Sequence, residues 1–367
     1  MITTTGALDR AADHMRTQDV DALLLGPGAD LRYLTGYAAL PLERLTLLVA
    51  RRDRRHALIV PELERPRAAA SGAGDLAEIV TVSETGDPLA AVASALEGAG
   101  TGALRLGVGD RLWSTFLLGL QEALPGASWE RASAITRELR MRKSSAEVDA
   151  LRRAAQAIDR VHARVSALLK PGRSEAEVGR DIAEAIMEEG HQTVSFVIVG
   201  SGPNSASPHH ESGARILQPG DAVVVDIGGT VDGYGSDCTR DYVIGDPPEG
   251  YAEAHAALEA AQAAACAAVR PGVTAESIDA AARDPLTGAG YGEYFIHRTG
   301  HGIGLEEHEE PFIVAGNELV LEPGMTFSIE PGIYLPGRFG MRIEDIVVVI
   351  KDGGERLNTL DREPVRV

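Results

Sequence analysis

The sequence predicts two domains, an α/β domain at residues 1–140 and an α+β domain with an internal pseudo-twofold repeat at residues 144–367. Three observations support this prediction. The chain of 367 residues is longer than one ordinary small domain. Its first part alternates short apolar runs with amphipathic ones, which is typical of layered α/β structure. Its second part contains two pairs of similar segments.

The first part has the pattern of a sheet flanked by helices. Short apolar runs predict strands at residues 22–25, 45–50, 56–60, 78–82 and 104–108. The second and third of these flank a basic segment, so we expect them to form a hairpin. Helices are predicted at residues 28–34, 88–97 and 114–123. Nothing in this part has the spacing of catalytic residues.

Two helix starts are visible in the second part. Ser144 is followed three residues later by Glu147, and Ser174 by Glu177. This spacing is that of a capping box, in which each side chain accepts a hydrogen bond from the backbone of the other residue. A third helix is expected in the alanine-rich segment 251–269.

The repeat consists of two pairs of segments, Leu169–Ser174 with Val269–Thr274 and Leu217–Gly220 with Leu321–Gly324. After the second pair, an acid arrives seven residues beyond the proline in both copies, as Asp226 and Glu330. The simplest explanation is two related helix–helix–hairpin units packed around a pseudo-twofold axis. Such packing brings acids from two hairpins to one point.

Four acids lie in apolar, strand-like runs, where a carboxylate is not expected: Asp226, Asp237, Glu330 and Glu344. Burying an unpaired carboxylate costs several kcal/mol, so each needs a cation or a proton. Salt bridges to Arg240, Arg298 or Arg342 are the alternative, but they account for only one or two of the acids. We therefore expect a metal site.

The segment Thr299–Pro311 holds two histidines, His301 and His308, with glycines around the first. Taken alone, this segment fits a surface turn with two exposed imidazoles. Beside four buried acids, however, His301 is the expected imidazole ligand. Carboxylates with one imidazole suit a pair of divalent ions such as Mn²⁺, Co²⁺ or Zn²⁺, which together activate a bridging water. The other histidines remain for proton transfer or stabilisation of an oxyanion.

Composition excludes several classes of protein. The net charge is −19, and residues 144–367 hold 18 basic and 36 acidic residues, so nucleic acid is not expected as a partner. No apolar run approaches a membrane span, and the N-terminus has no signal-peptide pattern. Two cysteines, Cys238 and Cys266, give no disulfide framework. A cytoplasmic protein is expected.

Five motifs in residues 144–367 together resemble the pita-bread metallopeptidases, the family of methionine aminopeptidase, aminopeptidase P and prolidase. They are Val225–Gly228, Gly235–Arg240, Thr299–Pro311, Ser328–Gly332 and Met341–Asp345. The first part resembles the creatinase-like N-terminal domain of the Xaa-Pro branch, notably at Asp30–Gly36. Methionine aminopeptidases lack that domain, so the Xaa-Pro branch is favoured.

The resemblance implies a ligand set for two divalent ions: Asp226, Asp237, His301, Glu330 and Glu344. In the family, the residues matching Asp237 and Glu344 bridge both ions, and the one matching Glu330 also acts as general base.

The resemblance also implies substrate residues. His308 is expected to stabilise the intermediate near the scissile carbonyl, and His209 to bind substrate. Arg342 is expected beside a bridging carboxylate and in contact with substrate. His210 is expected to be solvated.

The sequence differs from that of prolidases at Phe312. Prolidases often carry an arginine at this position, which pairs with the C-terminal carboxylate of the dipeptide. Either the enzyme prefers longer peptides, as aminopeptidase P does, or another arginine substitutes. Arg44 is our candidate for the substitute. The alternative is that Arg44 is an exposed residue paired with Glu43 or Asp30.

The resulting prediction is a cytoplasmic, homodimeric Xaa-Pro dipeptidase with two metal ions, Mn²⁺ before Co²⁺ or Zn²⁺, acting on small peptides with proline at the second position. One alternative is aminopeptidase P acting on Xaa-Pro-Yaa peptides. A more distant one is a non-catalytic, peptide-binding pseudo-peptidase. Creatinase shares the fold but works without metal, and that family has lost the ligand carboxylates that are present here.

Overall fold

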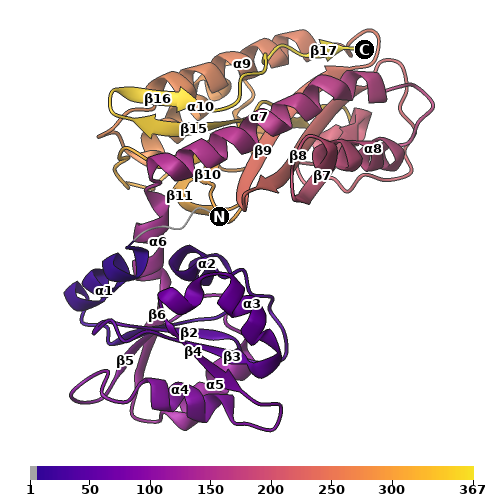
Figure 1. Ribbon diagram of the computed structural model, residues 1–367. Helices are drawn as coiled ribbons and strands as arrows, with labels where there is room; N and C mark the ends of the chain where they lie inside the picture. The colour runs from indigo at the N-terminus through magenta and orange to yellow at the C-terminus, as the bar shows by residue number, and fades with distance from the viewer. Residues whose placement is uncertain (1–5) are drawn as a thin grey trace. The chain divides into compact units, whose positions relative to one another are not determined.

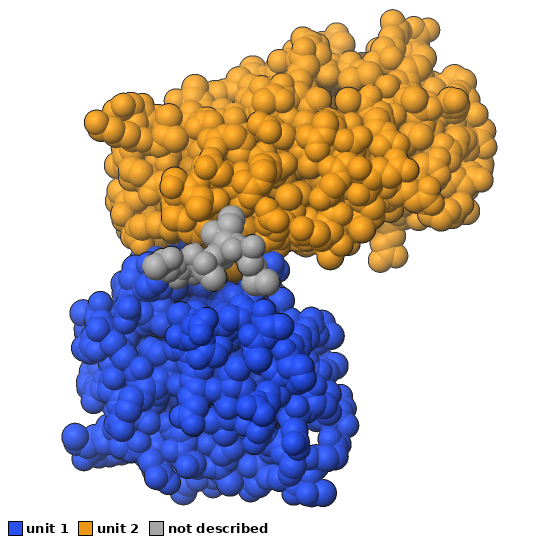
Figure 2. All heavy atoms as spheres, in the orientation of Figure 1, with its two compact units in different colours: residues 1–140 blue, residues 141–367 orange. Residues whose placement is uncertain are grey.

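The computed structural model describes residues 6–367, which divide into two compact units (Figures 1 and 2). Unit 1 ends at Arg140 and unit 2 spans Met141–Val367. Within the described residues, no helix combines the length and apolar character needed to cross a membrane.

Unit 1 contains a mixed sheet whose described strands run in the order β4-β3-β2-β1-β5-β6. β2 is antiparallel to both neighbours and the other pairs are parallel. The predicted hairpin of β2 and β3 is confirmed, with Leu48 opposite Leu58. β6 was not predicted because its sequence has only one apolar residue, Trp129. The bounds are β1 (Ala22–Leu25), β2 (Leu47–Arg51), β3 (Ala57–Pro61), β4 (Glu78–Val82), β5 (Arg105–Val108) and β6 (Ser128–Arg131).

The helices of unit 1 include the three that the sequence predicts, α2 (Ala29–Thr35), α4 (Pro88–Ala95) and α5 (Ser114–Ala123). The sequence prediction missed α1 (Ala7–Thr17), although its buried residues Leu8, Ala11 and Met15 follow a helical period. The remaining helices are α3 (Arg65–Ala70) and α6 (Ser133–Met141).

The helices of unit 2 form two pairs, α7 (Ser145–Leu168) with α8 (Glu175–Glu188) and α9 (Tyr251–Ala268) with α10 (Ala275–Gly288). Both predicted capping boxes are confirmed. The backbone N–H of Ser144 donates to Glu147 (2.9 Å), and that of Ser174 donates to Glu177 (2.8 Å).

Each helix pair of unit 2 packs on its own set of strands. α7 and α8 pack on the sheet β17-β9-β8-β7, while α9 contacts β12 and β16, and α10 contacts β11 in the sheet β11-β10-β12-β15-β16 (Figure 1). β13 and β14 form a hairpin between β12 and β15. The bounds are β7 (Thr193–Ser201), β8 (Ala222–Val231), β9 (Tyr234–Val243), β10 (Gly300–Gly302), β11 (Glu309–Ile313), β12 (Thr326–Ile329), β13 (Gly332–Leu335), β14 (Phe339–Arg342), β15 (Asp345–Ile350), β16 (Gly353–Arg356) and β17 (Val365–Arg366).

The predicted repeat is confirmed by equivalent backbone hydrogen bonds in the two halves of unit 2. The N–H of Gly172 donates to the carbonyl of Leu217 (3.0 Å), and that of Gly272 donates to Leu321 (2.9 Å). These two glycines have φ values of 91° and 89°, a conformation that other residues rarely adopt. The same turn therefore starts the second helix of each pair.

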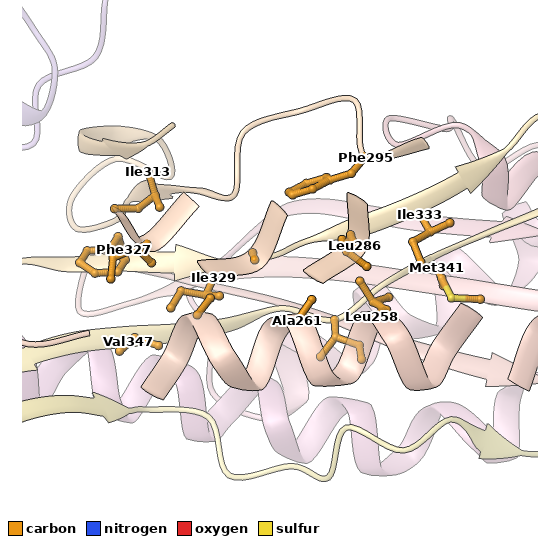
Figure 3. Packing of buried hydrophobic residues seen from close by; sticks show 14 of the residues in the cluster. Leu258, Ala261, Leu286, Phe295, Ile313, Phe327, Ile329, Ile333, Met341 and Val347 are labelled. Carbon is orange, nitrogen blue, oxygen red and sulfur yellow. The ribbon is translucent and has the colours of Figure 1, made fainter. Parts of the chain in front are cut away.

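Unit 2 has two hydrophobic cores, each built mainly from one half, and the core of the second half also includes Ala222 of β8 and Val243 of β9. In the first, residues of α7 and α8 such as Ile158 and Ile182 pack against β8 and β9, with Cys238 among them. In the second, Leu258 and Ala261 of α9 pack with Phe327 and Ile329 of β12 (Figure 3). The two cores support the β8–β9 hairpin and the β12–β15 strand pair, which position the four acids.

A buried polar pair lies between β9 and α9. Asp241 accepts a hydrogen bond from the backbone N–H of Arg342 (3.2 Å), and its other oxygen lies 3.6 Å from Nε2 of His255. Burial raises the pKa of Asp241 to about 8, although Arg342 and Arg240 oppose the shift. Burial also lowers the pKa of His255 to about 4, so both groups are neutral at pH 7.

We predict that Asp241→Asn removes part of the pH dependence of stability. The folded state keeps a proton on Asp241 that the unfolded chain releases, so stability is lost as pH rises from about 4 towards about 8. Asn does not titrate. The free energy of unfolding of the variant, relative to that of the wild type, should therefore increase by on the order of a few kcal/mol between acidic and alkaline pH. Urea unfolding at pH 5, 7 and 9 measures this difference. A difference that stays constant with pH would contradict the prediction.

Candidate metal centre

The hairpin of β8 and β9 places two acids on one face of its sheet. Asp226 is opposite Thr239, and Asp237 is opposite Gly228. Side chains two residues apart on a strand share a face, so Asp226 and Asp237 lie diagonally across the same face. Both acids are buried, with 7% and 4% of their surface exposed.

The other two acids lie just outside their strands, and not within them as the sequence predicted. Glu330 directly follows β12 and Glu344 directly precedes β15, where Ile329 is opposite Asp345. The pairing of β12 with β15 therefore holds the two glutamates close together. The hydroxyl of Thr239 donates to Glu344 (2.7 Å), which joins this part of the site to β9.

His301 lies on β10, between β11 and β12, and the glycines beside it are required by close packing. A Cβ atom at Gly300 would lie 1.9 Å from the carbonyl oxygen of Ser328, and one at Gly302 would lie 2.3 Å from that of Glu310. His301 is itself buried. The glycine-flanked histidine is therefore a buried strand residue and not part of a surface turn.

The orientation of the His301 ring suits a metal ligand. Nδ1 lies 3.2 Å from the carbonyl oxygen of Gly302, so this nitrogen carries the hydrogen. Nε2 then presents a lone pair, and it lies 3.2 Å from Glu330 and 3.6 Å from Asp237. Burial lowers the pKa of His301 to about 3, so these contacts are not ion pairs at pH 7. Acceptors that face one another in this way need a proton or a cation between them.

The carboxylates repel one another electrostatically. Burial raises the pKa of Asp237, and Glu344 and Asp226 add to the shift. Burial and the neighbouring Glu330 likewise raise the pKa of Glu344. Burial, opposed by Arg342, raises the pKa of Glu330 to about 7. Protonation or a bound cation would relieve this repulsion.

Two oxygens of the site are buried and have no hydrogen-bond partner in the described part of the chain, Oδ1 of Asp226 and Oε1 of Glu344. Three overlapping groups of ligand atoms, each within 4.8 Å, have the geometry to hold an ion: Asp237 with His301 and His308, His301 with Glu330 and Glu344, and Asp226 with Asp237 and Glu344. Because all five predicted ligands occur in these groups, the donor set fits more than one divalent ion.

Arg342 restrains this site from β14. Its guanidinium donates to Asp226 (2.5 Å), to the hydroxyl of Thr239 (3.0 Å) and to the hydroxyl of Tyr334 (2.8 Å). The sequence placed Arg342 near a bridging carboxylate, and the structure links it to Glu344 through Thr239. Of the four acids, only Asp226 has a salt bridge to an arginine within the described residues, because Arg240 pairs with Asp345 instead.

His308 and His209 are both exposed, and their contact with substrate remains a prediction. The His308 ring lies against that of His301, with 3.8 Å between the centroids. Its Nδ1 is 3.4 Å from a guanidinium nitrogen of Arg298. Partial burial of the His308 ring lowers its pKa, and the charge of Arg298 adds to the shift while that of Glu307 opposes it, so the ring is mainly neutral at pH 7.

The expectation that His210 is solvated was wrong. Its Nε2 lies 2.7 Å from Oε2 of Glu175, which is fully buried at the first turn of α8. Glu175 also accepts hydrogen bonds from the backbone and hydroxyl of Ser201 (2.8 and 2.6 Å). Glu175 was not predicted from the sequence, because an acid in the first turn of a helix is usually there for its favourable interaction with the helix dipole.

Arg44 lies in unit 1, where its guanidinium donates to Glu84 (2.8 and 3.0 Å) and pairs with Glu43. The pair with Glu43 was one of the two expected alternatives. Asp30, the other expected partner, binds Thr136 (3.0 Å) and Arg140 (2.7 Å). A contact of Arg44 with substrate remains a prediction.

Comparison with known proteins gives two family matches. The model of metallopeptidase family M24 matches residues 149–351, and that of the creatinase/prolidase N-terminal domain matches residues 8–142. The probable dipeptidase PepE of Mycobacterium tuberculosis is 52% identical over 347 residues, which cover 94% of this chain and 92% of the relative.

Two further proteins are similar over nearly their whole lengths. The Xaa-Pro dipeptidase of Lactobacillus delbrueckii subsp. lactis is 35% identical, with 94% of this chain and 95% of the relative covered. A prolidase structure from Thermococcus sibiricus superposes with a TM-score of 0.93 at 36% identity, covering 100% of both chains. These matches confirm the predicted fold class and family resemblance. The chain belongs to metallopeptidase family M24 and carries the N-terminal domain of the creatinases and prolidases.

Proposed function

We propose that this chain is an Xaa-Pro dipeptidase that uses two divalent ions. The observation that carries the proposal is the convergence of five buried or half-buried ligands: Asp226, Asp237, His301, Glu330 and Glu344. Two of their carboxylate oxygens have no hydrogen-bond partner among the described residues. The relatives named dipeptidase and Xaa-Pro dipeptidase support the substrate class. We assign the N-terminal domain to residues 1–140 and the catalytic domain to residues 144–367.

Two ions bound to these ligands would lower the pKa of a shared water and stabilise negative charge on the scissile carbonyl oxygen. Glu330 is suited to be the general base, because its carboxylate lies in the ligand cluster where the shared water would be held. The hydroxyl of Ser328 holds its carboxylate by a 3.0 Å hydrogen bond. The proton is then delivered to the imide nitrogen of proline, which has no hydrogen of its own and must gain one on leaving.

His308 has the correct tautomer to donate to substrate. The guanidinium of Arg298 is a donor only, so Nδ1 of His308 accepts and Nε2 carries the hydrogen. We assign Nε2 of His308 to the oxygen of the scissile carbonyl, and His209 to a second contact with the peptide. Arg342 orients Asp226 and borders the substrate.

The second candidate is aminopeptidase P activity on Xaa-Pro-Yaa peptides, favoured by Phe312 at the position where prolidases often carry an arginine. Turnover of Ala-Pro and Ala-Pro-Ala separates the two, and the dipeptidase proposal expects the higher kcat/KM for Ala-Pro. A peptide-binding protein without activity would bind both and cleave neither.

From the donor set and the family resemblance we further infer Mn²⁺ before Co²⁺ or Zn²⁺, a homodimer and a cytoplasmic location.

We predict that divalent ions stabilise the protein through Asp237. An ion at about 100 times its Kd adds about 2.7 kcal/mol to the free energy of unfolding. Removing metal with a chelator and adding back Mn²⁺ should therefore raise Tm, with two ions per chain by elemental analysis, and Asp237→Asn should lose most of this gain. Asp232→Asn is the matched control, because Asp232 lies in the turn of the same hairpin and binds Arg153 (2.8 Å). An equal rise in Tm on adding Mn²⁺ to the two variants would contradict the assignment of Asp237 as a metal ligand.

We predict that Glu330→Gln lowers kcat for Ala-Pro by a factor of about 10²–10⁴, because the general base is lost. Circular dichroism should show an intact fold, and metal content measured in parallel separates loss of the base from loss of an ion. Glu253→Gln, an exposed residue of α9, is the control and should keep wild-type rates. Wild-type rates in Glu330→Gln itself would refute the role.

We predict that Glu175→Gln raises KM for Ala-Pro by about tenfold with a smaller change in kcat, because it weakens the charge-assisted bond that positions His210 beside His209. Glu177→Ala is the control on the same helix, since among the described residues its carboxylate accepts hydrogen bonds only from the cap residue Ser174. That variant should lower Tm without changing KM. Equal KM values in all three proteins would show that Glu175 is merely structural.

A further inference from the structure

We propose that Arg298 binds a carboxylate group of the substrate, supplying the positive charge that Phe312 lacks. The inference rests on the proposed function and adds a specificity-determining residue to it. The carboxylate that Arg298 binds is one of two. It is the C-terminal carboxylate of a dipeptide, or the side chain of an acidic residue at the N-terminus of the substrate.

Strand pairing places Arg298 beside the metal ligands. Arg298 lies two residues before β10, and on the neighbouring strand β11 Phe312 is opposite His301. The Cζ atom of Arg298 lies 4.4 Å from the centroid of the Phe312 ring. The aromatic ring where prolidases often have an arginine is therefore covered by an arginine from the adjacent segment.

The position of the guanidinium next to His308 puts it within reach of substrate. One of its terminal nitrogens is 3.4 Å from Nδ1 of His308, whose ring lies against His301. An arginine stacked on a ring uses the face of its planar group and keeps the N–H groups on its edge available. Those N–H groups match both oxygens of a carboxylate at once.

Arg298 differs from nearby arginines in having no carboxylate partner among the described residues at salt-bridge distance. Arg342 pairs with Asp226 at 2.5 Å, Arg240 with Asp345 at 2.6 Å, and Arg283 with Asp279 at 2.9 Å. Arg298 is only half-buried, and its guanidinium contacts a histidine and an aromatic face. A cation of this kind beside a peptide site is positioned for an anionic ligand.

The test compares Arg298→Met and Arg298→Lys with the wild type, as metal-loaded full-length enzymes. One substrate pair is Ala-Pro and Ala-Pro-amide, and the other is Asp-Pro-amide and Asn-Pro-amide, so that each pair differs in one carboxylate. Arg298→Met should lower kcat/KM for one carboxylate-bearing substrate by about 10- to 100-fold, mainly through KM, and leave its uncharged partner within a few fold. Loss in the first pair identifies the C-terminal carboxylate as the target, and loss in the second identifies the side chain. Arg298→Lys should retain part of the preference, because it keeps the charge but not the planar fork.

Two further variants make the result specific. Arg338→Met is the matched control, because Arg338 also lies over a phenylalanine ring, Phe339 at 5.2 Å, but donates to the backbone of Glu249. It should leave both substrate ratios unchanged. Arg44→Ala tests the rival arginine, and loss of the preference in that variant alone would overturn the proposal.

Product inhibition gives a second readout, since proline and prolinamide differ in the same carboxylate. Unchanged substrate ratios in a folded Arg298→Met enzyme would overturn the role of Arg298 while the proposed function stands. A metal-loaded wild type that cleaves none of these peptides would overturn both.

Discussion

Mutual repulsion among buried carboxylates is the constraint on which the rest of unit 2 depends. Burial and the charges of neighbouring carboxylates raise the pKa values of Asp237, Glu330 and Glu344 and so favour their protonation. The protein compensates only in part, with Arg342 at Asp226 and the Thr239 hydroxyl at Glu344. Oδ1 of Asp226 and Oε1 of Glu344 are left without a hydrogen-bond partner among the described residues. Such a site is unfavourable without a cation and favourable with one, so stability and metal binding are coupled.

The pseudo-twofold repeat explains how the chain assembles this charge. Each half starts its second helix from the same glycine turn and then sends out a hairpin or strand pair bearing two acids. One core lies mainly under α7–α8 and the other mainly under α9–α10 (the second is shown in Figure 3). The backbone and side-chain bonds between Thr239 and Glu344 then fix the halves to each other. The repulsive ligands therefore meet where two stable substructures join.

Sequence reasoning succeeded where the signal was local. Capping boxes, the repeated Pro-Gly turns and acids in apolar runs identified the helices, the repeat and the residues that converge at the site. It failed where the deciding partner is distant in sequence. Glu175 and His210 are 35 residues apart, and nothing local shows that their side chains meet. Arg298 was considered only as a salt-bridge partner for an acid, and the structure pairs it with an aromatic ring and a histidine instead.

The same geometry separates the metal ligands from the arginine that we propose for substrate preference. His301 and Phe312 are opposite each other on antiparallel strands, so segments from both strands border the same space. A positive charge can therefore come from β11 or from the residues just before β10 without moving His301. Gly300 and Gly302 keep the backbone fixed against β12 and β11, whichever strand carries the charge. The ligands are constrained by repulsion and close packing, whereas the arginine that selects the substrate needs only to reach the surface beside His308.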